Sequence, residues 1–215
     1  EMDLKQHRAF DKIVACARST AEKYKKVFSQ PEKVMYLYNL IDESDVIVKS
    51  REQVSLQKKY PITLVSAGRL SFEKGFDRLI SAHARLMNEG LKHNLWIVGD
   101  GAEREKLEKL IKEKGVEGSV TLTGFDPNPY KYMASADAFV CSSRSEGMST
   151  VCVEALLVGT PIITTLVNGA QELCETGDAL SHPEKLAACR ENIGRMTNLR
   201  YADRLKAVVD FFENV

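Results

Sequence analysis

The fold of this chain can be inferred from one segment: Cys141-Ser142-Ser143-Arg144-Ser145-Glu146-Gly147-Met148-Ser149-Thr150-Val151-Cys152-Val153-Glu154-Ala155-Leu156. The apolar run just before it predicts a buried strand, and the apolar residues near its end predict a helix. The small and polar residues between them therefore form a loop that leads to a helix N-terminus. Backbone N–H groups at such an end have no acceptor within the helix, so those of Met148, Ser149 and Thr150 favour an anion such as phosphate.

Two glutamates flank this predicted anion site. Glu146 lies in the loop, and Glu154 lies about two turns into the helix. Glutamates in loops and helices usually face water, but Glu154 stands among apolar residues, where a carboxylate needs a partner. Two carboxylates beside a phosphate suit a polyhydroxylated ligand, and a nucleotide sugar carries hydroxyls on both sides of its diphosphate.

The segment belongs to a regular alternation of strands and helices that begins at Pro61. We expect strands at residues 62–67, 94–98, 119–123, 138–141 and 161–164, and helices at 76–88, between Gly101 and Gly115, at 130–134 and at 149–158. This alternation predicts an α/β fold, a Rossmann-like doubly wound parallel sheet with helices on both faces. The ligand of such a sheet binds at the carboxyl ends of its strands, near a topological switch point.

The loops at those strand ends carry the other candidate residues. Residues 68–75 place Arg69 and Lys74 after a strand, and an arginine fork with a lysine point charge suits a diphosphate. The same loop could also be a solvated basic turn, and it is not a P-loop. The Gly99-Asp100-Gly101 turn resembles the start of a dinucleotide fingerprint, but Arg104 replaces the third glycine and no acidic residue follows the next strand, which disfavours NAD.

Composition and single residues exclude several other functions. Thirty basic and 30 acidic residues leave no electrostatic footprint for nucleic acid. No D-x-D pattern and no C-x-x-C pair is present, so we expect no metal site and no cofactor. His83 on an apolar helix face and Trp96 in a strand are interpreted as core residues. Scattered cysteines, no apolar run of roughly 20 residues and no signal peptide indicate a cytoplasmic location.

The two ends of the chain differ from this regular middle. Strands are expected at residues 12–17 and 33–38, with a helix capped by Ser19 or Thr20 and ending near Phe28. Residues 39–59 are polar and suggest an irregular linker. We therefore expect residues 1–45 to be the tail of an N-terminal domain with the start of the linker, and residues 46–215 to be a second domain. Two helical stripes end the chain: Leu186, Cys189, Ile193 and Met196, then Tyr201, Leu205, Val208, Val209 and Phe212.

Together, these loops resemble a known family. From about Lys12 to Ala170 the chain is similar to the retaining glycosyltransferases of the family-four group, which have the two-domain GT-B architecture. The resemblance is carried by Gly68-Arg69-Leu70 with Lys74-Gly75, by Gly99-Asp100-Gly101, by Thr123-Gly124-Phe125, and by Glu146-Gly147-Met148-Ser149 through Glu154-Ala155, the family's E-x(7)-E element. It covers the end of the N-terminal acceptor domain and the C-terminal donor domain.

The resemblance implies a role for each residue. Arg69 and Lys74 would hold the diphosphate and stabilise the leaving nucleotide, and Glu146 would bind hydroxyls of the donor sugar. Glu154 would bind the ribose, and Phe125 would lie near the base. The remaining implied donor contacts come from backbone: Gly68, Gly99 and Gly101 by close approach, and Gly147, Met148, Ser149 and Thr150 as a phosphate cradle. Transfer would retain anomeric configuration and use a UDP-sugar or GDP-sugar without a metal ion.

The resemblance also implies partners and limits. The acceptor would be a glycan or glycolipid, and most of the N-terminal acceptor domain is missing. We therefore expect this chain alone to bind donor weakly and to transfer no sugar. Family analogy suggests polysaccharide biosynthesis at the inner face of the plasma membrane, with any peripheral membrane contact lying outside this chain. The alternative is a non-catalytic nucleotide-sugar-binding module.

Overall fold

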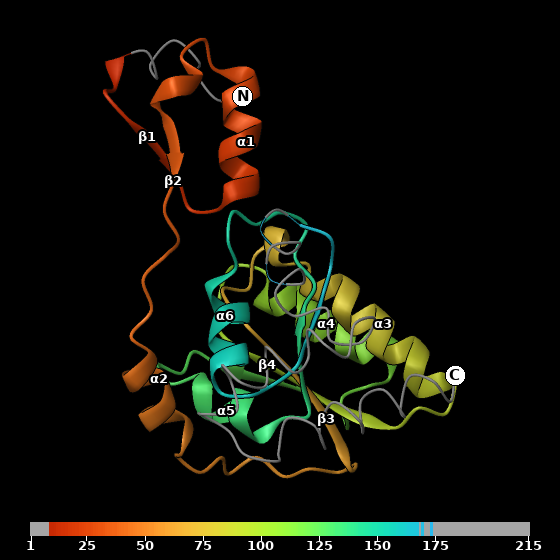
Figure 1. Ribbon diagram of the computed structural model, residues 1–215. Helices are drawn as coiled ribbons and strands as arrows, with labels where there is room; N and C mark the ends of the chain where they lie inside the picture. Colours follow the sequence, from red (N-terminus) through yellow and green to blue (C-terminus); the bar gives the residue numbers. More distant parts are fainter. Residues whose placement is uncertain (1–8, 168, 170–172, 174–215) are drawn as a thin grey trace.

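The computed structural model describes residues 9–167, 169 and 173, and its centre is a five-stranded parallel sheet (Figure 1). The strand order is β5-β4-β3-β6-β7, with β3 at Ile62–Ala67, β4 at His93–Val98, β5 at Val120–Gly124, β6 at Ala138–Cys141 and β7 at Ile162–Thr164. The connecting helices are α3 (Phe76–Asn88), α4 (Arg104–Lys114), α5 (Tyr130–Ser135) and α6 (Thr150–Leu157). The predicted strands and helices of this region therefore agree with the structure to within one residue, and the α/β fold class is confirmed.

Each face of the sheet is covered by helices because strand residues alternate between two cores. Leu64, Leu95 and Ile97 point to the face covered by α3 and α4. Val65, Trp96 and Phe139 point to the opposite face, where α5 and α6 pack. The sheet is thus doubly wound, and Trp96 and His83 are core residues as predicted, each 2% exposed.

A small β-α-β unit precedes this domain. β1 (Ile13–Ala15) pairs in parallel with β2 (Val34–Tyr36), and α1 (Arg18–Val27) and the short 3-10 helix η2 (Pro31–Lys33) connect them. The predicted cap was wrong: the helix starts after Ala17, so Ser19 and Thr20 lie inside its first turn, and Ala17 provides no side-chain cap. The chain folds into helix there without a cap because Ala17 and Ala21 are fully buried against the unit.

The predicted irregular linker contains a helix, α2 (Glu43–Ser50). Its N-cap is Asp42, whose Oδ1 accepts from the backbone N–H of Asp45 at 3.0 Å. Val46 is 2% exposed and belongs to the same core as α5 and α6. The expectation of irregular structure was therefore wrong for these residues, and the expected domain boundary near Asp45 falls inside α2. The predicted C-terminal helical stripes lie outside the described residues.

The central strands separate toward the candidate site. β3 and β6 pair at only two positions, Leu64 with Ala138 and Val65 with Phe139. Beyond these pairs, the Ser66 hydroxyl donates to the Val140 carbonyl at 2.6 Å in place of a backbone bond. β3 and β6 are also the neighbours at which the strand order reverses. A small crevice of about 10 Å³ lies at this topological switch point, with Ser66, Lys74, Cys141 and Glu146 among its lining residues.

Candidate functional site

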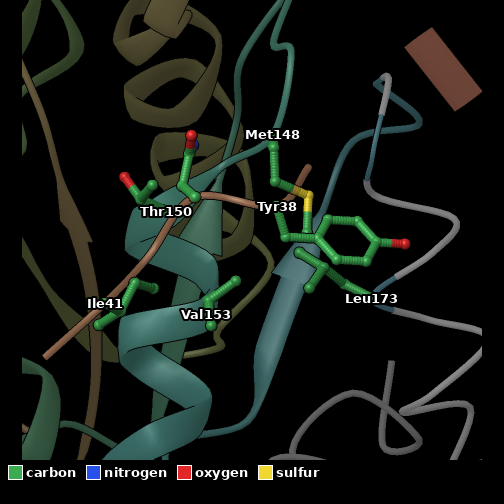
Figure 2. A pocket seen from close by; sticks show the side chains of 7 residues that line it. Tyr38, Ile41, Met148, Thr150, Val153 and Leu173 are labelled. Atoms are coloured by element: carbon green, nitrogen blue, oxygen red, sulfur yellow. The ribbon is translucent and has the colours of Figure 1, made fainter. Parts of the chain in front are cut away.

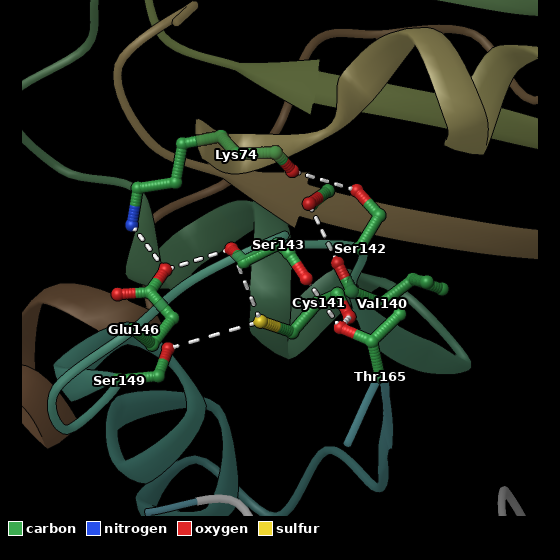
Figure 3. A network of polar contacts seen from close by, with 9 residues as sticks. Lys74, Val140, Cys141, Ser142, Ser143, Glu146, Ser149 and Thr165 are labelled. Atoms are coloured by element: carbon green, nitrogen blue, oxygen red, sulfur yellow. Dashed lines mark hydrogen bonds and ion pairs between the residues drawn. The ribbon is translucent and has the colours of Figure 1, made fainter. Parts of the chain in front are cut away.

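The two loops that border this crevice meet through an ion pair (Figure 3). One loop follows β3 and includes the 3-10 helix η3 (Phe72–Lys74), and the other follows β6. Lys74 Nζ lies 2.7 Å from Glu146 Oε1, and the Ser143 hydroxyl donates to the same oxygen at 2.7 Å. The side chains of Lys74 and Glu146 are 24% and 13% exposed, so the pair is largely shielded from water. The fold thus unites two residues separated by 72 positions that the sequence assigned to one site.

This geometry offers charge of both signs within one crevice. Lys74 uses one N–H on Glu146, and its other two have no acceptor among the described residues and could serve an anion. Glu146 receives both bonds on Oε1, so its second oxygen remains as an acceptor for a hydroxyl. A ligand that carries a phosphate next to a hydroxylated ring matches this arrangement. Partial burial strengthens such charge-assisted hydrogen bonds relative to bulk water.

The glycine turns after β3, β4 and β5 are tied to one another by backbone hydrogen bonds. The N–H of Gly68 donates to Val98 O and that of Gly99 to Gly124 O, both at 2.9 Å. A Cβ on Gly99 would overlap the Gly68 carbonyl oxygen, so this glycine is needed for loop packing. Gly101 approaches the Leu70 backbone in the same way. The roles of these glycines toward a ligand stay predictions.

The N-terminus of α6 faces the same edge of the sheet. Ser149 is the N-cap residue, and its side chain makes no capping hydrogen bond. Among the described residues, the backbone N–H groups of Met148, Ser149 and Thr150 have no acceptor. They are donors of the kind that bind phosphate at helix ends. Gly147 beside them touches the N-terminal unit, because a Cβ there would lie 2.9 Å from Cys16 Sγ.

Glu154 lies in α6, in the turn after the helix N-terminus, and its side chain is half-buried. Burial raises the pKa of its carboxyl, and a hydrogen bond with the Tyr130 side chain partly offsets this rise. Burial first, and then the charge of Glu154, raise the pKa of the Tyr130 hydroxyl. The side chain that most offsets the effect of burial on Glu154 is therefore the Tyr130 phenol from α5.

Two predicted site residues stay apart from the ion pair. Arg69 is exposed and makes no ion pair with a described residue, and Phe125, just after β5, is 78% exposed. Both remain predicted ligand contacts. Sequence reasoning missed Ser143 and Tyr130, which bond the two glutamates. Ser143 lies within the opening segment and only three residues before Glu146, whereas no sequence signal links Tyr130 to Glu154.

A cavity of about 290 Å³ lies beside the N-terminus of α6 (Figure 2). Met148, Thr150 and Val153 form one wall, and the segment between β2 and α2 contributes Tyr38, Asn39 and Ile41, with Leu173 completing the lining. The lining is mostly apolar, so the cavity suits an uncharged group. It adjoins the predicted phosphate cradle.

Two further classes of site were searched within the described residues. No group of three or more histidines, cysteines, aspartates or glutamates there is arranged to hold a metal ion. In that same part of the chain, no helix has the length and apolar character needed to span a membrane.

Comparison with known proteins identifies a family. Residues 47–205 match the family described as Glycosyl transferases group 1. The chain is 39% identical over 165 residues to the N-acetylgalactosamine-N,N'-diacetylbacillosaminyl-diphospho-undecaprenol 4-alpha-N-acetylgalactosaminyltransferase of Campylobacter jejuni, which covers 76% of this chain and 44% of that protein. It is 31% identical over 175 residues to the lipopolysaccharide core biosynthesis glycosyltransferase LpsE of Rhizobium meliloti, covering 81% and 50%. The chain thus spans about half the length of these relatives.

Solved structures share the fold. The HepE protein of Anabaena in complex with UDP and glucose superposes with a TM-score of 0.67 at 21% identity, over 97% of this chain and 64% of that one. The same protein in complex with UDP-glucose gives a TM-score of 0.67 at 19% identity, over 99% and 66%. At these identities the likeness establishes the fold alone.

Proposed function

Because the chain belongs to the group 1 glycosyltransferases, we propose that it carries the donor-binding half of an enzyme that transfers a sugar from a nucleotide-diphosphate sugar. The observation that carries this proposal is the Lys74–Glu146 pair at the switch point, next to the uncapped N-terminus of α6. A cation, a carboxylate and free amides in one crevice match a diphosphate joined to a hydroxylated ring. Relatives and fold neighbours whose names state sugar transfer or bound UDP support the same assignment.

The proposed chemistry is a group transfer at the anomeric carbon. The bond between that carbon and the diphosphate oxygen breaks, and its electron pair stays on the diphosphate. The oxygen of an acceptor hydroxyl forms the new bond, and its proton passes to the departing phosphate or to water. Negative charge therefore develops on the leaving group, where Lys74, Arg69 and the α6 amides stabilise it.

The remaining residues orient the donor in this proposal. Glu146 binds ring hydroxyls of the transferred sugar, Glu154 binds the ribose, and Phe125 lies near the base. No residue is assigned as a covalent nucleophile, although the anomeric configuration is retained. No metal ion is required, because Arg69 and Lys74 provide the positive charge that a bridging cation would otherwise supply.

The acceptor and the location are part of the proposal as well. The acceptor is a glycan or a lipid-linked glycan, which the Campylobacter relative's name supports. We place its site outside the donor-binding half, since this chain spans about half the length of its relatives. The reaction is placed in the cytoplasm, consistent with free thiols at Cys16, Cys141 and Cys152. That half-length match also keeps the alternative open, a module that binds nucleotide sugar without turnover.

Calorimetric titration of the chain with UDP, GDP, ADP and NAD tests the donor role. We expect a response to at least one nucleoside diphosphate and none to NAD. Tight NAD binding with no response to the diphosphates would refute the proposal.

Two further measurements refine it. Glu154→Ala should weaken binding of the nucleotide that the unaltered chain prefers, by about tenfold for one lost charge-assisted hydrogen bond. Unchanged affinity would remove the ribose role of Glu154. We also expect no sugar transfer by this chain alone, and measurable transfer would show that the acceptor site is already present, which would also exclude the binding-module alternative.

A further inference from the structure

Arg144 connects the loop after β6 to the segment that contains η3 and the first turn of α3. It forms more hydrogen bonds between these two segments than Lys74 or Glu146 does. It follows β6 and lies two positions before Glu146. Its guanidinium forms a two-pronged ion pair with Asp77, with both N–O distances at 2.7 Å, and it also donates to the Phe72 carbonyl at 2.9 Å. The same group stacks on the Phe72 ring at 4.2 Å, and the Arg144 backbone N–H donates to Glu73 O at 2.7 Å.

These contacts involve residues that both precede and follow Lys74 in the chain. Phe72 and Glu73 precede it in η3, and Asp77 lies in the first turn of α3. The Lys74 carbonyl itself accepts from the Ser142 hydroxyl at 2.9 Å. The backbone between Lys74 and Asp77 is therefore pinned to the loop after β6 at both ends.

Gly75 completes this fixed segment. Its φ of +65° is a left-handed conformation, and a Cβ there would overlap the Ser142 carbonyl oxygen. The segment thus reverses direction in direct contact with the opposing loop. Lys74 enters the crevice from a backbone that cannot shift without breaking the Arg144 contacts.

We propose that Arg144 is a positioning residue: it holds η3 against the loop after β6 so that Lys74 is fixed where the diphosphate of the donor binds. This inference rests on the proposed function, and it assigns Arg144 no contact with the donor. The planar fork suits the role, because it satisfies the Asp77 carboxylate and the Phe72 carbonyl at once and stacks on a ring. The two-pronged bond with Arg144 lowers the pKa of the Asp77 carboxyl, so the pair stays charged at neutral pH.

Binding of UDP, GDP and the corresponding monophosphates, measured by calorimetry, tests this role. The base with the higher diphosphate affinity is used for all variants. Arg144→Gln should weaken diphosphate binding by about tenfold, the worth of one charge-assisted hydrogen bond, while monophosphate affinity stays unchanged. Arg144→Lys should recover only part of the loss, because an ammonium cannot form the fork.

A double-mutant cycle with Lys74→Ala shows whether Arg144 acts through Lys74. In the Lys74→Ala background, Arg144→Gln should cost no further diphosphate affinity. Equal losses in both backgrounds, or equal losses for mono- and diphosphate, would overturn the proposal. Asp77→Asn provides an independent test that leaves Arg144 in place, and diphosphate affinity equal to that of the unaltered chain would also overturn it. If the unaltered chain binds no nucleotide at all, the proposed function itself fails.

Discussion

Two histidines form a buried pair beneath α3. His83 Nδ1 lies 2.8 Å from His93 Nε2, His93 Nδ1 lies 2.8 Å from Leu91 O, and His83 Nε2 lies 2.8 Å from the Ser119 hydroxyl. A carbonyl only accepts, so His93 donates through Nδ1 and accepts from His83 Nδ1. His83 Nε2 then accepts from the Ser119 hydroxyl at 2.8 Å, and this hydroxyl shares its proton with the Val116 carbonyl at 3.1 Å. Each ring is satisfied while neutral.

This pair makes stability depend on pH. Burial, and then the neighbouring His93, lower the pKa of His83 to about 3, whereas a histidine in the unfolded chain titrates near about 6.5. Between these values the unfolded chain binds a proton that the folded chain does not, so stability falls as pH falls. We expect His83 to contribute a loss of about 2 kcal/mol between pH 7 and pH 5.

Urea unfolding of the unaltered chain and of His83→Gln at several pH values measures this contribution. The variant should be less stable at pH 7, but its stability should fall less steeply with pH, so the difference narrows toward pH 5. Parallel pH profiles for the two proteins would contradict a depressed His83 pKa.

The Tyr130–Glu154 contact leads to a second pH effect. Burial raises the pKa of the Glu154 carboxyl, and the Tyr130 hydrogen bond lowers it. Tyr130→Phe should therefore raise this pKa further, so that a larger fraction of the carboxyl is protonated at the lower of two pH values. We expect nucleotide affinity to fall by up to about tenfold at pH 6 and by less at pH 8, measured by calorimetry. Equal losses at both pH values would show that the hydroxyl acts on the ligand and not on Glu154.

At the residue scale, sequence reasoning identified candidates better than partners. It predicted that His83 is a core residue and that the Glu154 carboxylate needs a polar partner. In the structure His83 is buried, and the Tyr130 side chain interacts with Glu154. Sequence reasoning could not name His93 or Tyr130, because these contacts join different elements and depend on how helices settle on the sheet. The hydrophobic periodicity of a segment predicts which face of a helix or strand a residue occupies. It does not predict which residue of another element packs against that face.

At the scale of elements, periodicity predicted every β-strand and α-helix from β3 to β7, because each has an apolar face and most have a glycine or proline at a boundary. The short 3-10 helix η3 (Phe72–Lys74) was not predicted, since its residues were assigned to a loop. α2 was missed because its three apolar residues, Val46-Ile47-Val48, are consecutive and β-branched and show no helical spacing, and only Val46 is buried. Its stability comes from the Asp42 cap and from packing on α5 and α6, which are tertiary features. The position of α1 was missed for a similar reason, since buried alanines and not a capping side chain define its start.

Two glycines that end or begin helices allow a matched test of loop packing. Gly75 and Gly115 both have φ of +65°, but a Cβ at Gly115 meets no atom within 4 Å, whereas a Cβ at Gly75 overlaps the Ser142 carbonyl. Gly115→Ala should cost about 1 kcal/mol of unfolding free energy for the left-handed conformation alone. Gly75→Ala should cost about 2–4 kcal/mol, because crowding adds to that strain.

Urea unfolding of both variants measures the difference, and nucleotide titration adds a functional readout. Gly75→Ala should weaken diphosphate binding because it moves Lys74 away from Glu146, and Gly115→Ala should not. Equal stability losses would mean that the loop after β6 yields to the added methyl group, so that η3 is not rigidly held.

At the scale of the whole molecule, the proposed function assigns different roles to the N-terminal unit and the main domain. The predicted donor contacts, from Gly68 to Glu154, all lie in the domain built on the five-stranded sheet. The β1–α1–β2 unit has two strands, fewer than an independent sheet needs, and Val14, Met35 and Tyr36 are 53%, 47% and 42% exposed. A surface of this kind is expected where further strands or another domain would pack.

The N-terminal unit nevertheless touches the main domain next to the N-terminus of α6. The Ser19 hydroxyl accepts from the Gly169 N–H at 3.2 Å, and Cys16 Sγ lies against Gly147. Among the described residues, the hydrogen-bond and ion-pair partners found for Lys74 and Glu146 come from the two loops after β3 and β6. The contacts of Ser19 and Cys16 hold the unit against the loop after β6 and the residue Gly169. In the proposed function the donor charges come from the main domain.

Deleting residues 1–36 separates the two roles. We expect the shortened chain to bind the preferred nucleoside diphosphate within about threefold of the unaltered chain, since a contact worth less than about 1 kcal/mol changes affinity by no more than that. It should also self-associate less in analytical ultracentrifugation, because the exposed apolar strands are removed. A matched substitution, Ser19→Ala in the full chain, controls for the loss of the Gly169 contact alone. A contradictory result would be a deletion that weakens nucleotide binding more than tenfold while Ser19→Ala does not. The N-terminal unit would then have to supply donor contacts of its own. The proposed division of the molecule into a donor half and an acceptor half would be wrong.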